Sequence, residues 1–526
     1  MARFQTSRDL LLLTLICVLL GSVSCHKVLI LPGISVGSHF LYFAKLGEHL
    51  KSKGHDVTML LGENNNALNK IPHIVDSFHF EKYTTAMDNE LMTKLDKMLT
   101  KSLNGQFNPM DVMFINNALV EDCVLLLENQ ELFQRLKRKE FDIILINNFA
   151  ACTILMSQKL DLPFVIVSTN RPMTMMDAYY LNMPSPISYV PSMISGLSDN
   201  MNCGQRLSNL IYRIIGHLMY RFLFLAPYDE LKLKYDIKPE MGMMTSSGRS
   251  EITLFAVDWA LEFPRPIMPN TIFLGGLLAS PQSPLTNEWV EFMKSARHGV
   301  VILSFGSTAD LASCPEKAEL VCAELARLPQ KVIMKYNGPP PITLGNNTKL
   351  TKWMPQNDLL GHPNTKAFVT HGGMNGVYEA IYHAVPIVGF PLYGDHYDTF
   401  SRVSSKGIAV ILDIGTLTPG ELYNAVIKVI NTPSYKENAK KISAIHKDKP
   451  MSAGDTAVFW IEYVIKHGGQ HLRAAAFNLS FIEYFLIDIA VFLIVVIAVV
   501  FFVLKKAITV ICNIYCNKKI IKMKVT

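Results

Sequence analysis

The segment between Trp353 and His396 gathers residue types that suit the binding of a phosphorylated ligand. An apolar run ending at Thr370 is followed by His-Gly-Gly-Met-Asn-Gly at positions 371–376, and then by a helix-like stretch. Glycines placed directly after a strand let the backbone approach a ligand closely. Free N–H groups at the start of the following helix attract phosphate. The segment therefore predicts a phosphate site at a strand-to-helix turn.

Side chains around this turn supply the other contacts that a sugar nucleotide requires. Trp353 offers a flat face on which a base can stack. Glu379 lies one helical turn beyond Asn375 and can reach a pair of ribose hydroxyls, while Asp395 can accept hydrogen bonds from sugar hydroxyls. A Gly-Gly pair after a strand is common in α/β proteins, but the complete string is far more specific.

A candidate base lies near the N-terminus. The apolar run Val28 to Leu31 leads into a glycine-containing loop that ends at His39. Histidine suits general base chemistry because its pKa lies near the working pH. A histidine in a loop often has no catalytic role, so the loop alone leaves both interpretations open.

Short apolar runs alternate with helix-length stretches, which predicts doubly wound α/β sheets of parallel strands. A Pro/Ser-rich linker at 280–286 divides the chain into an N-terminal domain at 26–279 and a C-terminal domain at 287–470. Ligands of such sheets bind at the carboxyl ends of the strands, here in the cleft between the domains. The predicted strands are Val28–Leu31, Ile143–Ile146, Phe164–Val167, Val300–Leu303, Lys331–Met334, Ala367–Val369, Ile387–Gly389 and Ile408–Leu412.

The two ends of the chain indicate membrane targeting. Residues 1–25 have a basic start, a short apolar run and small residues, as in a signal peptide, with an uncleaved anchor as the alternative. The apolar stretch 484–504 is about long enough to cross a bilayer, with a buried core helix as the alternative. The tail 505–526 is basic, and basic residues stay cytosolic, so the bulk of the chain is expected in the lumen.

Other features refine this expected location. Lys522 and Lys524, fifth and third from the end, resemble the dilysine retrieval signal of endoplasmic reticulum membrane proteins. Asn346 and Asn478 begin glycosylation sequons. The nine cysteines show no CxxC spacing, so no zinc site is predicted. A luminal disulfide is compatible with them, but its pairing cannot be deduced.

The composition of the chain argues against disorder and against nucleic-acid binding. The 526 residues are 49% hydrophobic and carry a net charge of +6, much of it in the tail, so we expect a large core and no nucleic-acid partner. The stretch from about 171 to 225 is rich in methionine and aromatic residues. Such a segment could bind a lipophilic acceptor, contact a membrane surface or pack in the core. The sequence leaves open whether the chain forms a homo-oligomer.

Together these motifs resemble the UDP-glycosyltransferase family, which contains the UDP-glucuronosyltransferases, over nearly the whole chain. The runs at 344–350, 394–399 and 471–475 are most similar to the ceramide galactosyltransferase branch. The resemblance implies a GT-B fold with two domains facing a cleft, and inversion of the anomeric centre without a metal or other cofactor. The chain also lacks the Asp-x-Asp motif of metal-dependent sugar transferases.

The resemblance also assigns roles to single residues. Trp353 would stack on uracil beside Gln356, Glu379 would bind the ribose, and Asp395 with His396 would hold the sugar. His39 would deprotonate the acceptor hydroxyl. The residues implied at the diphosphate are Ser307, His371, Gly373, Asn375 and Gly376.

The chain departs from the family at the residue that orients the base. Family members have an aspartate at the end of a later strand, where this chain has Asn147. An amide can still accept from the imidazole N–H of His39 and fix its tautomer, but it cannot stabilise the imidazolium that forms. A non-catalytic binder of sugar nucleotides or lipids is therefore an alternative to an enzyme.

Two positions bear on the donor sugar. Glucuronosyl members generally carry an arginine nine residues before the arginine of Phe-Pro-Arg-Pro, where it can pair with a carboxylate. Here Ala256 stands nine residues before Arg265, and His396 replaces the usual glutamine. The resemblance thus favours UDP-galactose, then UDP-glucose, with UDP-glucuronate as the alternative. A membrane-bound hexosyltransferase acting on a lipophilic hydroxyl, such as a sphingolipid, is the expected function.

Overall fold

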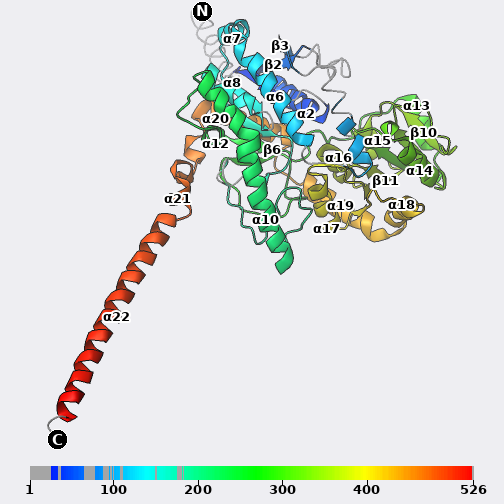
Figure 1. Ribbon diagram of the computed structural model, residues 1–526. Coiled ribbons are helices and arrows are strands. Elements are labelled where there is room, and N and C mark those ends of the chain that lie inside the picture. Colours follow the sequence, from blue (N-terminus) through cyan, green and yellow to red (C-terminus); the bar gives the residue numbers. More distant parts are fainter. Residues whose placement is uncertain are drawn as a thin grey trace, which may run out of the picture. The chain divides into compact units, whose positions relative to one another are not determined.

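The computed structural model describes residues 25–33, 37–63, 78–86, 100–106, 111–148, 151–174, 183–307 and 309–523, together with residues 94, 97, 98 and 181. Nearly all of the predicted signal peptide at 1–25 lies outside the described residues. The chain forms two compact units, Met1–Leu472 and Arg473–Thr526. Figure 1 shows both units.

The first sheet has seven parallel strands in the order β3-β2-β1-β4-β5-β6-β7. Successive side chains of its central strands enter two different hydrophobic clusters, so both faces of the sheet are buried. The strands are β1 (Lys27–Leu31), β2 (Asp56–Gly62), β3 (His79–Tyr83), β4 (Ile143–Asn147), β5 (Phe164–Ser168), β6 (Thr253–Phe255) and β7 (Thr271–Phe273).

The second sheet has six parallel strands in the order β10-β9-β8-β11-β12-β13. Its strands are β8 (Val300–Ser304), β9 (Lys331–Lys335), β10 (Thr348–Thr351), β11 (Thr365–Thr370), β12 (Ile387–Gly389) and β13 (Ala409–Ile411). Every strand predicted from an apolar run is present, and two doubly wound parallel sheets are confirmed. The sequence analysis missed β2, β6 and β7, and it missed β3 and β10, which are polar edge strands.

Helices follow most strands, as the doubly wound pattern requires. In the first half these are α2 (Gly37–Ser52), α6 (Asp111–Glu128), α7 (Gln130–Arg138), α8 (Cys152–Leu160), α10 (Cys203–Met219), the π-helix η1 (Tyr220–Leu225), α11 (Ala226–Lys234) and α12 (Met243–Ser247). In the second half they are α13 (Asn287–Lys294), α14 (Pro315–Ala326), α15 (Gln356–Gly361), α16 (Met374–Tyr382), α17 (His396–Ser405), α18 (Glu421–Asn431), α19 (Pro433–Lys447) and α20 (Ala453–His467), with the short 3-10 turns Leu311–Ser313 and Gln470–Leu472.

Helix α20 leaves the second half and returns to the first sheet. Its residues Ala457 and Ile461 lie in one hydrophobic cluster with Val28 and Phe40, and Glu462 accepts a hydrogen bond from His55 at 2.9 Å. The sequence analysis had grouped all of 287–470 with the C-terminal half. Helix α20, at the end of the first unit, therefore packs on the N-terminal half.

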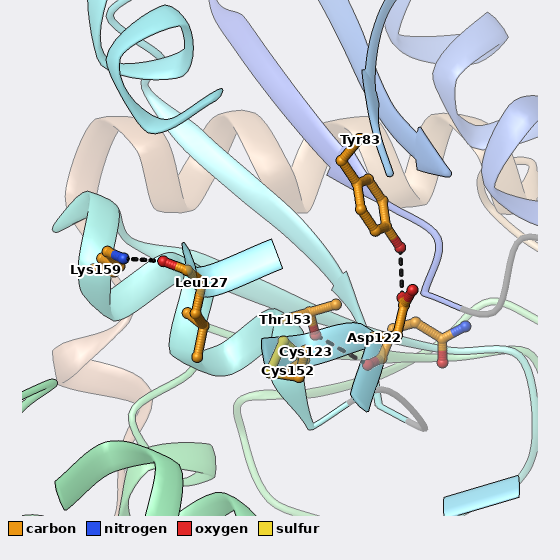
Figure 2. The surroundings of a disulfide bond; sticks show 8 residues. Tyr83, Asp122, Cys123, Leu127, Cys152, Thr153 and Lys159 are labelled. Carbon is orange, nitrogen blue, oxygen red and sulfur yellow. Dashed lines mark hydrogen bonds between the residues drawn. A yellow bond between two sulfur atoms is a disulfide. The ribbon is translucent and has the colours of Figure 1, made fainter. Parts of the chain in front are cut away.

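A disulfide between Cys123 and Cys152 joins α6 to α8 (Figure 2). Next to it, the Tyr83 hydroxyl donates to Asp122 at 2.7 Å, so β3, α6 and α8 are held together. The two cysteines are 29 residues apart in the sequence. Closing a loop of this length restricts the unfolded chain and contributes about 3 kcal/mol of stability. The sequence could not give this pairing, because spacing alone does not identify partners.

The second unit contains a long apolar helix. After a 3-10 turn (Ala475–Asn478) and α21 (Phe481–Tyr484), α22 runs from Ile487 to Met523, and its part Ile487–Tyr515 is long and apolar enough to cross a membrane. Leu486 has a positive φ of 53° and separates α21 from α22. The helix thus begins three residues after Tyr484, the start of the apolar stretch, and continues beyond the end of that stretch at residue 504.

A buried carboxylate ties the two halves of the first unit together. Glu262 accepts from Arg171, which follows β5, at 3.2 Å and from Arg402 of α17 at 2.7 Å. These three side chains are at most 8% exposed. Burial alone would raise the pKa of Glu262, but Arg402 and Arg171 outweigh it and lower that pKa. The ionised carboxylate is therefore the form that this network holds.

We predict that Glu262→Gln lowers the free energy of unfolding by about 3–5 kcal/mol, because it removes the carboxylate that is paired with two buried guanidinium groups. The measurement is chemical denaturation of the detergent-solubilised protein. Glu288→Gln is the matched control, since Glu288 pairs with Lys349 at an exposed position, and surface pairs contribute about 0–1 kcal/mol. Equal effects of the two substitutions would show that Glu262 does not link the halves.

Candidate active site

The carboxyl ends of three neighbouring strands bring the candidate base and its partners together. His39 lies in the first turn of α2 after β1, Asn147 is the last residue of β4, and Thr169 follows β5. The order in which the chain adds strands to the sheet reverses between β1 and β4. Such a switch point is where doubly wound sheets bind ligands.

The Asn147 amide contacts His39 with its nitrogen. Asn147 Nδ2 lies 3.2 Å from His39 Nδ1 and donates to the carbonyl of Pro32 at 2.7 Å. Turning the amide over would place its oxygen against that carbonyl, so Pro32 fixes the orientation. His39 Nδ1 then accepts a hydrogen bond, and Nε2 carries the proton. The predicted direction, in which the amide accepts from the ring, is therefore reversed, because the Pro32 carbonyl requires a donor.

The surroundings of His39 keep its ring neutral. Although the side chain is only half-buried, desolvation lowers the pKa of His39 to about 4, and the charge of Asp395 opposes this shift. At neutral pH the ring is thus unprotonated, as a base must be. Thr169 Oγ1 lies 3.2 Å from Nδ1 and 3.3 Å from Nε2. The sequence analysis missed Thr169, for which the position directly after a buried strand was the available signal.

In the second half, the start of α16 forms a close-packed turn around His371. A Cβ added at Gly306 or Gly373 would lie within 2.7 Å of the His371 ring, so both positions need glycine. Gly373 is the N-cap of α16 and provides no side-chain cap, so the helix presents free N–H groups where Asn375 and Gly376 also lie. This geometry supports the phosphate site predicted from the sequence.

Two buried imidazoles line the same turn. The rings of His371 and His396 lie edge to face with centroids 4.8 Å apart. Burial lowers the pKa of His371, and it lowers the pKa of His396 to about 3. Both rings are therefore neutral at pH 7 and can act as hydrogen-bond donors to oxygen atoms of a ligand. Ser307 is exposed in the loop after β8.

Of the residues predicted to contact uracil and the ribose, two lie in contact with each other. Gln356, at the start of α15, donates to Glu379 of α16 at 2.5 Å. Burial raises the pKa of Glu379 to about 7, and the Gln356 hydrogen bond opposes the shift. Trp353 follows β10 and is 60% exposed, which leaves its face free for stacking.

Asp395 and His396 sit where the two halves meet. Arg171 donates to the backbone oxygen of Asp395 at 3.4 Å and to Thr399 at 3.1 Å. Burial raises the pKa of Asp395, and Arg171 opposes this shift. Asp395 thus lies within the electrostatic reach of His39. The sequence analysis missed Arg171, since an arginine after a strand gives no distinctive signal.

Lys335 is a third residue that was not predicted from the sequence, after Thr169 and Arg171. It ends β9, and its ammonium group donates to the carbonyl of Gly306. Its charge also acts on His371, so it adds positive potential beside the phosphate turn. Within the described residues, no group of three or more His, Cys, Asp or Glu is arranged to hold a metal ion.

A small apolar cavity lies in the first half. Its lining includes Ile146, Asn148, Met173, Tyr220 and Leu225. Asn148 follows Asn147 directly, so the cavity borders the carboxyl end of β4. Part of the methionine-rich segment therefore lines a cavity in the first half, in addition to packing in the core.

Comparisons with known proteins agree with this geometry. The family model for UDP-glucoronosyl and UDP-glucosyl transferase matches residues 26–524. The 2-hydroxyacylsphingosine 1-beta-galactosyltransferase of Homo sapiens is 38% identical over 496 residues, which cover 92% of this chain and 88% of that protein. UDP-glucuronosyltransferase 2C1 of Oryctolagus cuniculus is 40% identical over 484 residues, covering 89% of this chain and 95% of that protein.

Solved structures share the fold at low sequence identity. The kitacinnamycin glycotransferase is 19% identical with a TM-score of 0.57, and the match covers 84% of this chain and 98% of that one. A UDP-glucosyltransferase from Polygonum tinctorium is 15% identical with a TM-score of 0.58, covering 85% and 99%. The two facing parallel sheets are thus a GT-B fold, and the chain belongs to the UDP-glucuronosyl and UDP-glucosyl transferase family of glycosyltransferases.

Proposed function

We propose that this enzyme transfers a neutral hexose, galactose first and glucose second, from its UDP-sugar to a lipophilic hydroxyl such as that of a sphingolipid. The observation that supports the sugar preference is the environment of Asp395. Arg171, which contacts it, is already paired with buried Glu262, and His371 and His396 are neutral. A glucuronate carboxylate finds no counter-charge in these three side chains.

The similarity to 2-hydroxyacylsphingosine 1-beta-galactosyltransferase supports both the galactose and the lipid acceptor. The apolar cavity behind β4 supports a lipophilic acceptor as well. The alternative is glucuronate transfer to small lipophilic compounds, which the similarity to UDP-glucuronosyltransferase 2C1 favours.

In the proposed reaction the acceptor hydroxyl attacks the anomeric carbon from the face opposite UDP. The hydroxyl proton moves to His39, and UDP leaves with the electron pair of the broken bond; no metal takes part. Because Asn147 donates to Nδ1, Nε2 carries a proton at rest. Before Nε2 can accept the hydroxyl proton, the Asn147 amide must stop donating to Nδ1 and the ring proton must move from Nε2 to Nδ1. We expect this tautomer change to slow the step.

The base assignment predicts that His39→Ala loses roughly 10²–10⁴-fold in initial rate at saturating donor, while UDP binding stays intact. Asn147→Asp should raise the rate, because a carboxylate accepts from Nδ1–H and stabilises the developing imidazolium. The same substitution removes the hydrogen bond to Pro32, so its thermal unfolding midpoint should fall. An active wild type with an equally active His39→Ala variant would overturn this role for His39.

The donor assignment is tested with radiolabelled UDP-galactose, UDP-glucose and UDP-glucuronate. Microsomes containing the enzyme are incubated with each donor and a mixed lipid extract, and microsomes without it serve as the control. We expect the highest label in a lipid product with UDP-galactose, followed by UDP-glucose. A clear preference for UDP-glucuronate would contradict the neutral-hexose proposal.

We further propose a single-pass type I protein of the endoplasmic reticulum membrane, with a cleaved signal peptide and both sheets in the lumen. The Cys123–Cys152 disulfide supports an oxidising compartment. The sequon residues Asn346 and Asn478 are exposed and therefore accessible to glycosylation. The basic tail after α22 supports a cytosolic C-terminus.

This topology predicts that protease added outside intact microsomes removes only about two dozen C-terminal residues, the length of the predicted basic tail, because the membrane shields the rest. Cys123 and Cys152 should also resist alkylation until a reductant is added. Detergent-opened microsomes are the control for protease activity. Digestion of the two sheets in intact vesicles would rule the topology out.

A further inference from the structure

Helix α10 is drawn in green in Figure 1. Together with the π-helix η1 that continues it, it carries a row of large exposed apolar side chains. The residues recur every three or four positions, so they share one face. Each is between 38% and 63% exposed: Leu207, Leu210, Ile211, Ile214, Ile215, Leu218 and Phe222. An apolar surface of this extent is unusual for a face in contact with water.

The opposite, protein-facing side of α10 is polar. Asn209 is fully buried and donates to the carbonyls of Ile187 at 2.7 Å and Val190 at 3.0 Å. Arg213 is 6% exposed and donates to Ser185 at 3.1 Å. A helix on the surface of a water-soluble protein has the reverse arrangement, with its apolar stripe toward the core. The surroundings that suit α10 are therefore apolar on its outer side.

A lipid bilayer is the apolar environment that this chain is expected to adjoin. Helix α22 is long and apolar enough to cross a membrane, so the first unit is tethered to one. Arg206 and Tyr212 flank the apolar row and suit a headgroup region, which favours basic and aromatic side chains.

The inner side of η1 gives this surface a connection to the candidate active site. Tyr220 and Leu225 line the apolar cavity beside Asn148, whereas Phe222 of the same π-helix is 63% exposed. The π-helix η1 therefore lines the cavity with its inner side and belongs to the exposed apolar face with its outer side. Single π-helical turns occur frequently at functional sites.

We propose that the outer face of α10 and η1 lies in the bilayer surface, and that a lipid acceptor reaches the cavity past η1 without leaving the membrane. The second part rests on the proposed transfer to a lipophilic acceptor. The first part concerns only the position of the helix and stands without it.

The position of the helix is tested by tryptophan fluorescence of the full chain in phosphatidylcholine vesicles, with and without bromine atoms on the acyl chains. Leu218→Trp is the probe, and Ile215→Trp serves if that variant does not fold. Ile342→Trp is the control, since Ile342 is 96% exposed on the second half. Wild-type spectra are subtracted, because four native tryptophans contribute to every sample.

The Leu218→Trp signal should be blue-shifted and lose more than half its intensity with brominated lipid, while the Ile342→Trp signal should be water-like and unchanged. A water-like, unquenched Leu218→Trp signal would overturn the proposal. A blue-shifted but unquenched signal would overturn it as well, because a second copy or another protein would then cover the face. These readouts do not depend on turnover, so they remain valid if the proposed function fails.

The acceptor route is tested with Ile211→Asp combined with Ile215→Asp, two exposed positions where charge is expected to leave the fold intact. Transfer to a long-chain acceptor in vesicles should fall at least tenfold relative to wild type, while transfer to a short-chain soluble analogue should be unchanged. Equal rates on both acceptors, or equal losses, would overturn the route. A wild type inactive on every acceptor would instead count against the proposed function.

Discussion

The carboxylate of Glu262, held between Arg171 and Arg402, is the interaction on which the geometry of the site depends. Arg171 also holds the start of α17 through Asp395 and Thr399. The sugar-binding residues proposed for the second half are thereby fixed against the half that carries His39. Because these groups are buried, breaking one contact leaves an uncompensated charge, which is costly.

This arrangement divides the chemistry between the halves. In the proposed reaction the second half binds the UDP-sugar through helix N–H groups, neutral imidazoles and an exposed tryptophan. The first half supplies a neutral histidine and an apolar cavity. Asn147 makes the base unusual, because its amide is anchored to Pro32 and donates to the ring. Asp395 of the second half is then a charge that favours the imidazolium.

The sequence predicted the strands around Val28, Ile143 and Phe368 because each is a buried apolar run, and the glycine turn at 371–376 because its chemistry is local. It did not predict the Arg171–Glu262–Arg402 network, whose partners lie 91 and 140 residues apart. It also missed the return of α20 and the orientation of the Asn147 amide. Those features depend on contacts between distant segments, which no local pattern encodes.

The central claim is that the acceptor, activated in the first half, displaces UDP held by the second half in a single step. The most direct measurement is the anomeric configuration of the product, read from the coupling of its anomeric proton by NMR after reaction with a UDP-α-hexose. Direct displacement predicts a β-linked product. An α-linked product would contradict it, because retention requires either a second displacement or attack from the side of the leaving group.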